Sequence, residues 1–323
     1  MYSTQQISLD GYEGVELSDS ETQMCVKTLH RLGNNIVEFS KGGFNHLWVP
    51  KDFRSLVGSR NLFGMPLMAP WVNRLASDSY SIQERTFHLN PSLDSLLVRD
   101  ENNHPLHGLL LYSPRWEVVE LGATSTEAFS HSRLLFGSYP DYLSHFPFSF
   151  DIDVVTKLTN GSLVIQTIVT NQSEFDLPIN LGYHPYFRLP GNFRQEWELT
   201  FPAKEEWELN SVNLPTGNRN PLHQSYSLRL GEKKVDNLYG LDQSVLCPSR
   251  VSLSDGRTEL SIEVGPKYPY LMVFAPLHYD YVCIEPMTAP VNAFELEKEV
   301  RNLHFITPGK KWAETLVISV RSV

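Results

Sequence analysis

Hydrophobic and polar residues alternate with a period of two over residues 148–154. The same alternation returns over residues 163–169, after the dipeptide Asn160-Gly161. Asn-Gly is favoured in two-residue hairpin turns, because both positions adopt a positive φ there. The pattern therefore predicts an antiparallel hairpin with one face packed on an apolar core.

Shorter patterns of the same kind recur along the chain. A second hairpin is predicted around Asp255-Gly256, and further strands are predicted over residues 36–39 and 46–49. Few stretches have the period of a helix. Short strands separated by turns predict an all-β fold, a large antiparallel β-sandwich. Because no internal repeat or linker interrupts the sequence, we expect a single domain over residues 1–323.

Composition narrows the class of protein. The 323 residues are 41% hydrophobic and 20% charged, which is enough apolar material for a large core and excludes a disordered chain. The formal net charge is −10. Since proteins that bind nucleic acids need a basic face, we expect no nucleic-acid partner.

The cysteines and the N-terminus indicate a compartment. Cys25, Cys247 and Cys283 are odd in number and show no CxxC spacing, which is typical of a reducing environment. The sequence has no apolar run of the roughly 18 residues that a transmembrane helix needs. Residues 1–6 lack the basic and apolar parts of a signal peptide. We therefore expect a cytoplasmic protein without a membrane partner.

Residues 281–292 begin as a strand and then place a carboxylate before a proline. Residues 282–284 suit a buried strand, and Pro286 predicts that the strand ends at Glu285. A glutamate at the end of a buried strand is costly unless it is hydrogen-bonded or functional. Glu285 is therefore either a strand-edge side chain that reaches solvent or part of a functional site.

Two further segments hold polar residues in constrained surroundings. In the Gly- and Pro-containing segment 63–75, Arg74 follows Asn73 and is either a ligand for hydroxyl or carboxylate groups or a structural clamp. His104 and His107 lie three residues apart, but no cysteine or second histidine pair completes a metal site. Each is a hydrogen-bonded core histidine or a donor to a ligand.

Two more candidates lie in the second half of the chain. His184 precedes Pro185 and is flanked by aromatic residues, a context that suits either a packed core histidine or a catalyst. Asp236 is followed by Asn237 in a turn-like context, so it either caps a turn or binds a ligand.

Taken together, the sequence resembles the aldose 1-epimerase (mutarotase) family over roughly residues 36–307. Five segments carry the resemblance, in the order typical of the family: Pro70-Trp71-Val72-Asn73-Arg74, Leu106-His107-Gly108, Gly182-Tyr183-His184-Pro185-Tyr186-Phe187, Val235-Asp236-Asn237-Leu238-Tyr239 and Cys283-Ile284-Glu285-Pro286. The resemblance implies the galactose mutarotase-like β-supersandwich fold. It also implies interconversion of the α and β anomers of a free hexose, without a cofactor or a metal.

The resemblance assigns a role to each matching residue. Glu285 matches the general base, His184 the general acid, and His107 a second histidine that binds the sugar and supports the proton transfers. The positions that hold sugar hydroxyls match Arg74, Asn73 and Asp236. One position departs from the galactose enzymes: Met272 stands where they carry a glutamine, and a thioether cannot replace the donors of an amide. This departure speaks against a preference for galactose.

The chemistry accounts for these residue types. Opening a pyranose ring requires removal of the proton on the anomeric hydroxyl and delivery of a proton to the ring oxygen. A carboxylate and a histidine on opposite sides of the acetal do both at neutral pH. The reaction therefore requires an ionised Glu285 and a protonated His184 at the start.

Three alternatives use the same residues differently. A hexose-6-phosphate epimerase of the same superfamily would need basic residues such as Lys51, Arg54 or Arg60 beside Arg74 at the pocket rim. A glycosidase would use Asp236 and Glu285 as a carboxylate pair. A non-catalytic sugar-binding protein would have no need for an acid–base pair. We therefore expect a small monosaccharide as the partner.

Overall fold

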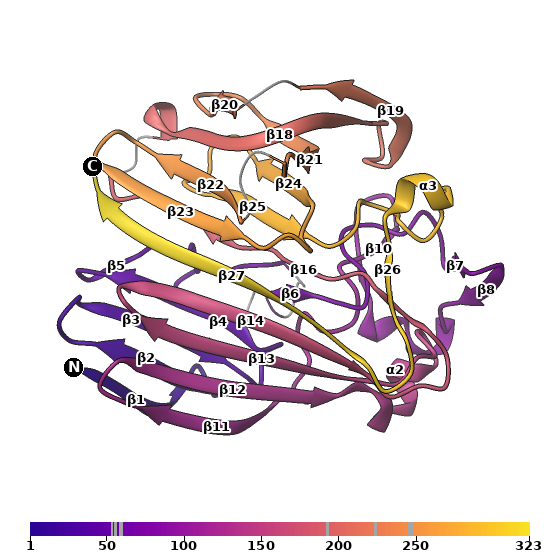
Figure 1. The fold of residues 1–323 in the computed structure, drawn as a ribbon, viewed down its shortest axis with the longest axis horizontal. Coiled ribbons are helices and arrows are strands. Elements are labelled where there is room, and N and C mark those ends of the chain that lie inside the picture. Colours follow the sequence, from indigo (N-terminus) through magenta and orange to yellow (C-terminus); the bar gives the residue numbers. More distant parts are fainter. Residues whose placement is uncertain (53, 55–56, 58–60, 192–193, 223–224, 245–247) are drawn as a thin grey trace.

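The structure is a computed structural model, and it describes residues 1–323 except 53, 55–56, 58–60, 192–193, 223–224 and 245–247. Antiparallel β-strands make up most of its regular structure, as predicted (Figure 1). The helical segments are short: η1 (Pro91–Leu96), η2 (Phe136–Ser138), α2 (Pro140–Leu143), η3 (Arg194–Glu196) and α3 (Lys298–Arg301).

A 16-stranded sheet forms the frame of the fold. Its strands follow the spatial order β11 (Glu117–Ala123), β12 (Glu127–Leu135), β13 (Phe150–Thr159), β14 (Ser162–Asn171), β27 (Lys311–Ser322), β23 (Thr258–Val264), β22 (Ser249–Ser254), β18 (Glu198–Leu209), β21 (Val235–Leu241), β24 (Tyr270–Ala275), β25 (Val282–Met287), β16 (Gly182–Tyr183) and β6 (Leu67–Met68). Three strands pair beside this path: β17 (Tyr186–Phe187) with β25, and β19 (Pro215–Pro221) and β20 (Ser225–Arg229) with β18.

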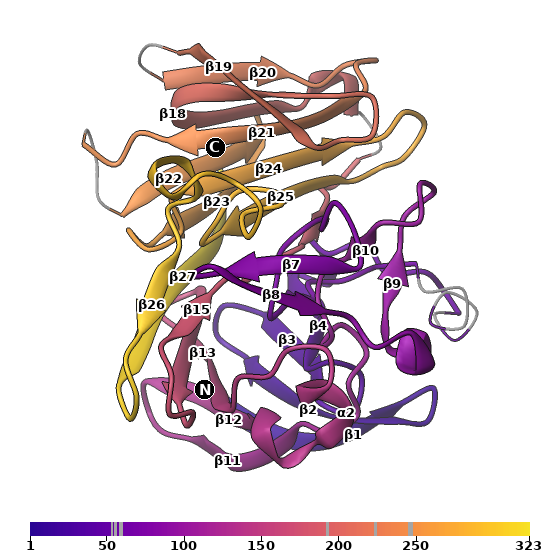
Figure 2. The same cartoon turned by 90° about the vertical axis from the view of Figure 1, so that its right-hand side faces the viewer.

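A second, five-stranded sheet packs against strands β11 to β13 of the large sheet and completes the sandwich (Figure 1). It consists of β1 (Tyr2–Leu9), β2 (Tyr12–Asp19), β3 (Met24–Leu29), β4 (Asn35–Lys41) and β5 (Phe44–Asn45). Three two-stranded ribbons complete the strands of the described residues: β7 (Ser79–Ile82) with β8 (Arg85–His88), β9 (Val98–Arg99) with β10 (Pro105–Leu106), and β15 (Leu177–Ile179) with β26 (His304–Ile306). Figure 2 shows β7 and β8 running across the middle of the molecule.

Both predicted hairpins are present, as β13–β14 and β22–β23. Asn160 and Gly161 have φ values of 48° and 69°, the positive values that make Asn-Gly a favoured hairpin turn. The predicted strand over residues 36–39 lies within β4. The predicted strand over residues 46–49 is wrong: β5 ends at Asn45, whose Oδ1 accepts the N–H of Leu47, the chain bends at His46, and Leu47 forms an isolated bridge to Phe187.

Strand β25 also differs from the prediction, because it continues through Pro286 to Met287. On one side its ladder with β24 is continuous from Cys283 to Met287. On the other side it pairs with β17 at Cys283 and with β16 at Met287, and the ladder is interrupted between them. A proline, which has no N–H to donate, is tolerated where a ladder is interrupted.

Glycine at position 108 is required by the fold. Gly108 has φ +75°, and a Cβ there would lie 2.1 Å from the carbonyl oxygen of Ala69. Gly256, in the predicted hairpin turn, has φ +81° but open space around the corresponding position. A left-handed alanine costs about 1 kcal/mol at either site, whereas the clash at Gly108 adds about 1–3 kcal/mol.

We therefore expect Gly108→Ala to lower the free energy of unfolding by about 2–4 kcal/mol, and Gly256→Ala by about 1 kcal/mol. Urea denaturation of the two variants and the wild type measures the difference. Equal losses in the two variants would contradict the close approach of residue 108 to Ala69.

Candidate active site

A cleft with a volume of about 410 Å³ lies where the 63–75 segment, the β16–β17 connection and strands β21, β24 and β25 meet. All six residues that the sequence singled out as site residues line it. The full lining is Asn61, Leu62, Asn73, Arg74, Val98, Arg99, Leu106, His107, His184, Tyr186, Asp236, Phe274 and Glu285. The sheet therefore brings together residues that lie far apart in the sequence.

Glu285 and His184 meet at the interruption of the ladder beside β25. The β16–β17 connection, which contains His184, crosses this gap, and the backbone N–H of His184 donates to the carbonyl of Pro66. The ring of His184 also stacks on Tyr186 at a centroid distance of 4.8 Å. These contacts place Nε2 of His184 3.2 Å from Oε1 of Glu285.

Both side chains are buried, so Glu285 does not reach solvent as a strand-edge residue. The exposed fraction is 1% for Glu285 and 5% for His184. Among the described residues, three buried polar atoms of the cleft have no hydrogen-bond partner: Oε2 of Glu285, Nδ1 of His184 and Nδ1 of His107. Buried polar atoms without partners are costly, and a polar ligand in the cleft would satisfy them.

Burial determines the protonation of this pair. It raises the pKa of Glu285 well above its ordinary value, and the nearby charge of Asp236 raises it further. It lowers the pKa of His184 to about 3, and the charge of Arg74 acts in the same direction. Burial therefore favours a neutral carboxyl beside a neutral imidazole, not the ionised pair that the chemistry requires at the start.

His107 and Asn73 are held in an unusual backbone conformation. Their φ values are +60° and +49°, and the N–H of His107 donates to the carbonyl of Asn73 at 2.8 Å. Left-handed backbone costs about 1–2 kcal/mol at residues other than glycine, and such positions cluster at functional sites. The ring of His107 lies edge-on to that of His184, at a centroid distance of 5.0 Å. Burial, followed by the charge of His184, lowers the pKa of His107.

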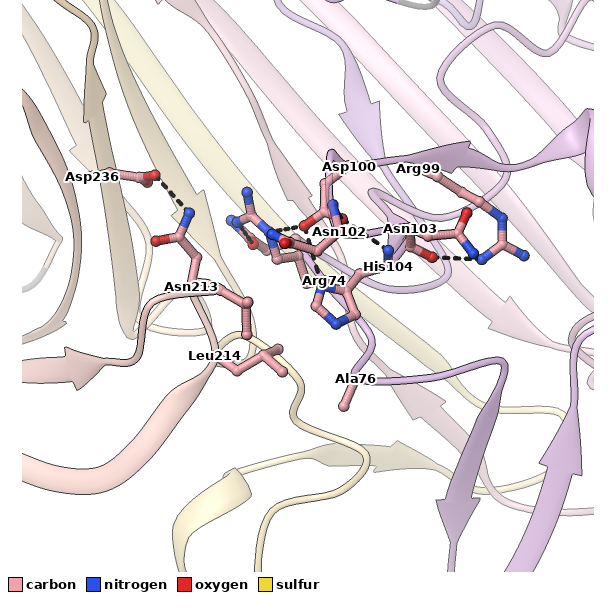
Figure 3. Close-up of polar contacts among 12 residues, drawn as sticks. Arg74, Ala76, Arg99, Asp100, Asn102, Asn103, His104, Asn213, Leu214 and Asp236 are labelled. Atoms are coloured by element: carbon pink, nitrogen blue, oxygen red, sulfur yellow. Dashed lines mark hydrogen bonds and ion pairs between the residues drawn. The ribbon is translucent and has the colours of Figure 1, made fainter.

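Arg74 combines the two possibilities that the sequence left open. It lines the cleft, and it is also clamped, because its Nε donates to Oδ2 of Asp100 at 2.7 Å and its Nη1 to Oδ1 of Asn73 at 3.0 Å (Figure 3). His104, by contrast, does not line the cleft; its Nδ1 lies 3.3 Å from Oδ2 of Asp100. His104 is therefore a hydrogen-bonded structural histidine.

Asp236 is a strand residue rather than the turn cap that its sequence context allowed. It lies near the start of β21, opposite Phe274 of β24. Its Oδ2 accepts a hydrogen bond from Nδ2 of Asn213, in the loop between β18 and β19 (Figure 3). Burial raises the pKa of Asp236, although the charge of Arg74 opposes this.

Met272 lies opposite Glu285 in the β24–β25 ladder but does not line the cleft. Its side chain is 1% exposed and belongs to an apolar cluster that includes Met68, Leu238 and Met287. The residue of β24 that lines the cleft is Phe274. On β24, therefore, the aromatic ring of Phe274 lines the cleft and the side chain of Met272 does not.

Sequence reasoning missed Asp100 and Asn213, which hold two of the cleft residues. The signal for Asp100 was a turn sequence, Asp100 to His104, in which an aspartate accepts backbone N–H groups. Asn213 gave no signal beyond that of an ordinary turn residue.

Three further features concern metal ligands, membrane-spanning helices and thiols. Within the described ranges, no group of three or more His, Cys, Asp or Glu side chains is arranged to hold a metal ion. None of the described helices is long and apolar enough to cross a membrane. Cys25 and Cys283 have free thiols, and Cys247 lies outside the described residues.

Comparison with solved structures shows which proteins share this fold. A galactose mutarotase-like protein from Clostridium acetobutylicum is 19% identical with a TM-score of 0.86, and the match covers 100% of this chain and 99% of that one. A galactose 1-epimerase from Lactobacillus acidophilus is 15% identical with a TM-score of 0.79, covering 100% and 99%. A putative aldose 1-epimerase from Escherichia coli K12 is 18% identical with a TM-score of 0.73, covering 99% and 100%.

Sequence comparison matches the chain to a protein family but to no individual curated protein. No curated protein sequence matches the chain. The sequence model of the aldose 1-epimerase family, however, matches residues 16–319, which is nearly the whole chain. The chain therefore belongs to the aldose 1-epimerase family.

Proposed function

We propose that this protein interconverts the α and β anomers of a free hexose, with Glu285 as general base and His184 as general acid. The observation that carries the proposal is the buried contact between these two side chains, 3.2 Å apart at the cleft and each with an unpartnered polar atom. A carboxyl and an imidazole in this arrangement can exchange protons with a hemiacetal.

The proposed reaction needs no group beyond the side chains. Glu285 removes the proton from the anomeric hydroxyl while His184 delivers a proton to the ring oxygen, and the C1–O5 bond breaks. Rotation about the C1–C2 bond then presents the other face of the aldehyde. On closure the two side chains exchange roles, so the enzyme ends in the protonation state in which it began.

Sugar binding would favour the ionised state that burial disfavours. One proton is shared by the pair, and its transfer from Glu285 to His184 spans only the 3.2 Å contact. Hydroxyl groups that donate to the carboxylate favour its ionised form, and the charge of Arg74 also lowers the pKa of Glu285. Asn73, Arg74 and Asp236 would hold the other hydroxyls, and His107 would contribute its Nδ1.

The charges of the cleft favour a free sugar over a sugar phosphate. Within the described lining, Arg74 and Arg99 are the two arginines, and both are neutralised by carboxylates: Arg74 by Asp100, and Arg99 by Asp78 and Asp94. Lys51 and Arg54 are not among the lining residues, Arg54 donates instead to the carbonyl of Asp10, and Arg60 lies outside the described residues. A phosphate dianion would require uncompensated donors.

The experiment that tests this function is the rate of anomerisation in the presence of the wild-type protein. Freshly dissolved α-glucose and α-galactose are followed by polarimetry, and glucose 6-phosphate by exchange NMR. We expect acceleration with a free hexose and a smaller effect with the phosphate. Preference for the phosphate would favour the phosphosugar epimerase, and hydrolysis of a disaccharide would favour the glycosidase. Sugar binding without acceleration would favour the non-catalytic protein.

The proposed base predicts a pH effect at Asp236. Because the charge of Asp236 raises the pKa of Glu285, Asp236→Asn lowers that pKa. The pair keeps its single proton only below the pKa of Glu285, so the basic limb of the kcat/KM profile should move to lower pH, although kcat/KM itself falls through loss of a sugar contact. Asp153→Asn, in β13 away from the cleft lining, is the control and should leave the limb in place. A basic limb that stays in place or moves to higher pH in Asp236→Asn would contradict the assignment of Glu285.

A further inference from the structure

Asp100 makes four contacts through one buried carboxylate, whose side chain is 5% exposed. Its Oδ1 accepts the backbone N–H groups of Asn102 and His104, at 2.9 and 2.8 Å. Its Oδ2 accepts Nε of Arg74 at 2.7 Å and lies 3.3 Å from Nδ1 of His104. The turn thus fixes the direction of the carboxylate independently of Arg74 (Figure 3).

This arrangement determines how the guanidinium of Arg74 is presented. Nε is bound to Asp100 and Nη1 to Asn73. Nη2 is the nitrogen of this guanidinium without a hydrogen-bond partner in the described part of the chain. A rigid planar fork with two of its three nitrogens fixed leaves the third in a defined place at the cleft.

The same turn also leads into the backbone of the site. It connects β9 to β10, and β10 continues directly into His107. Leu106 forms a bridge with Arg74, and the N–H of Leu75 donates to the carbonyl of Pro105. The clamp on Arg74 and the segment that carries His107 are therefore parts of one small unit.

We propose that Asp100 is a positioning residue that holds the Arg74 guanidinium so that Nη2 binds a sugar hydroxyl. The inference rests on the proposed function for its substrate. Asp100 itself does not line the cleft, and it acts through Arg74. Its loss should weaken sugar binding in the ground state and the transition state alike, which raises KM and leaves kcat nearly unchanged.

The test measures KM, kcat and the equilibrium Kd for the hexose in Asp100→Asn. We expect KM and Kd to rise about tenfold and kcat to stay within about twofold, the pattern of lost uniform binding. Asp100→Ser is the second variant, because a hydroxyl still accepts N–H groups of the turn while the contact with Arg74 is lost. Asp141→Asn is the matched control: Asp141 also pairs with an arginine, Arg115, but neither residue lines the cleft.

A double-mutant cycle separates positioning from a general structural role. In an Arg74→Met background, Asp100→Asn should change KM and Kd by less than about twofold, because the residue through which it acts is absent. An equal rise in both backgrounds, or a fall in kcat with KM unchanged, would overturn the proposal. A KM that does not change in either Asp100 variant would do the same.

The Kd measurement keeps this inference distinct from the proposed function. A wild type that binds the hexose without accelerating anomerisation would refute the proposed function, while the Kd values would still decide the role of Asp100. A wild type that does not bind a hexose would overturn both.

Discussion

Replacing Glu285 with glutamine is expected to lower kcat for anomerisation by about 10²- to 10⁴-fold, the usual contribution of a positioned general base. The amide has nearly the shape of the carboxylate, so the sugar still binds, but it cannot take the proton of the anomeric hydroxyl. Polarimetry of the wild type and the variant at equal concentration measures the loss. Glu263→Gln, a matched change in β23 outside the cleft lining, should keep the wild-type kcat.

The stability of the same variant should move in the opposite direction. Burial raises the pKa of Glu285 in the folded protein above its value in the unfolded chain. A group of this kind favours the folded state at pH values below its unfolded pKa, and that contribution is lost as pH rises through the folded pKa. Above the unfolded pKa the acid therefore destabilises the fold, and Gln removes this cost. A urea midpoint at neutral pH equal to or higher than that of the wild type is expected, so a loss of activity with a lower midpoint would point to misfolding instead.

Replacing His184 with glutamine is the second change with a large expected effect. Removal of the proton donor to the ring oxygen should lower kcat by about 10²- to 10⁴-fold. Polarimetric assays across the neutral pH range should show the loss of kcat at every pH, because glutamine does not titrate. His145→Gln is the control: His145 is also buried, but it binds the N–H of Asn90 and does not line the cleft. This control should cost stability and leave kcat near the wild-type value.

The two side chains should behave as one unit. If proton removal and proton delivery belong to one concerted step, the double variant Glu285→Gln/His184→Gln should be scarcely slower than either single variant. Multiplying effects would instead show that each residue acts in a separate step.

The strands were predictable where the alternation of residues was strict and the turn was local. The β13–β14 hairpin met both conditions, because Asn160-Gly161 alone determines its turn. The predictions failed where pairing depends on distant partners. The extent of β25 past Pro286 follows from the interrupted ladder with β16 and β17, and no residue near Pro286 in the sequence indicates that gap.

The residues of the site divide in the same way, into those with a local sequence signal and those that depend on distant partners. Glu285 and His184, which line the cleft, could be singled out because each lies in a short segment with a recognisable order of residues. Asp100 and Asn213 could not, since each contributes one hydrogen bond to a side chain from a different part of the chain, Arg74 and Asp236. Local sequence identifies the residues that face the cleft more readily than those that hold them in place.

The order of strands in the large sheet has a consequence for how the protein folds. Strands β25, β16 and β6 are neighbours in space but come from three distant parts of the chain. Contacts of such long sequence separation give a high contact order, which slows folding because large loops must close before the contacts form. The local hairpins can form early, whereas the pairing that brings His184 to Glu285 awaits the closure of the sheet. The proposed activity should therefore appear only when folding is complete, because a nascent chain that lacks β25 cannot form the contact between His184 and Glu285.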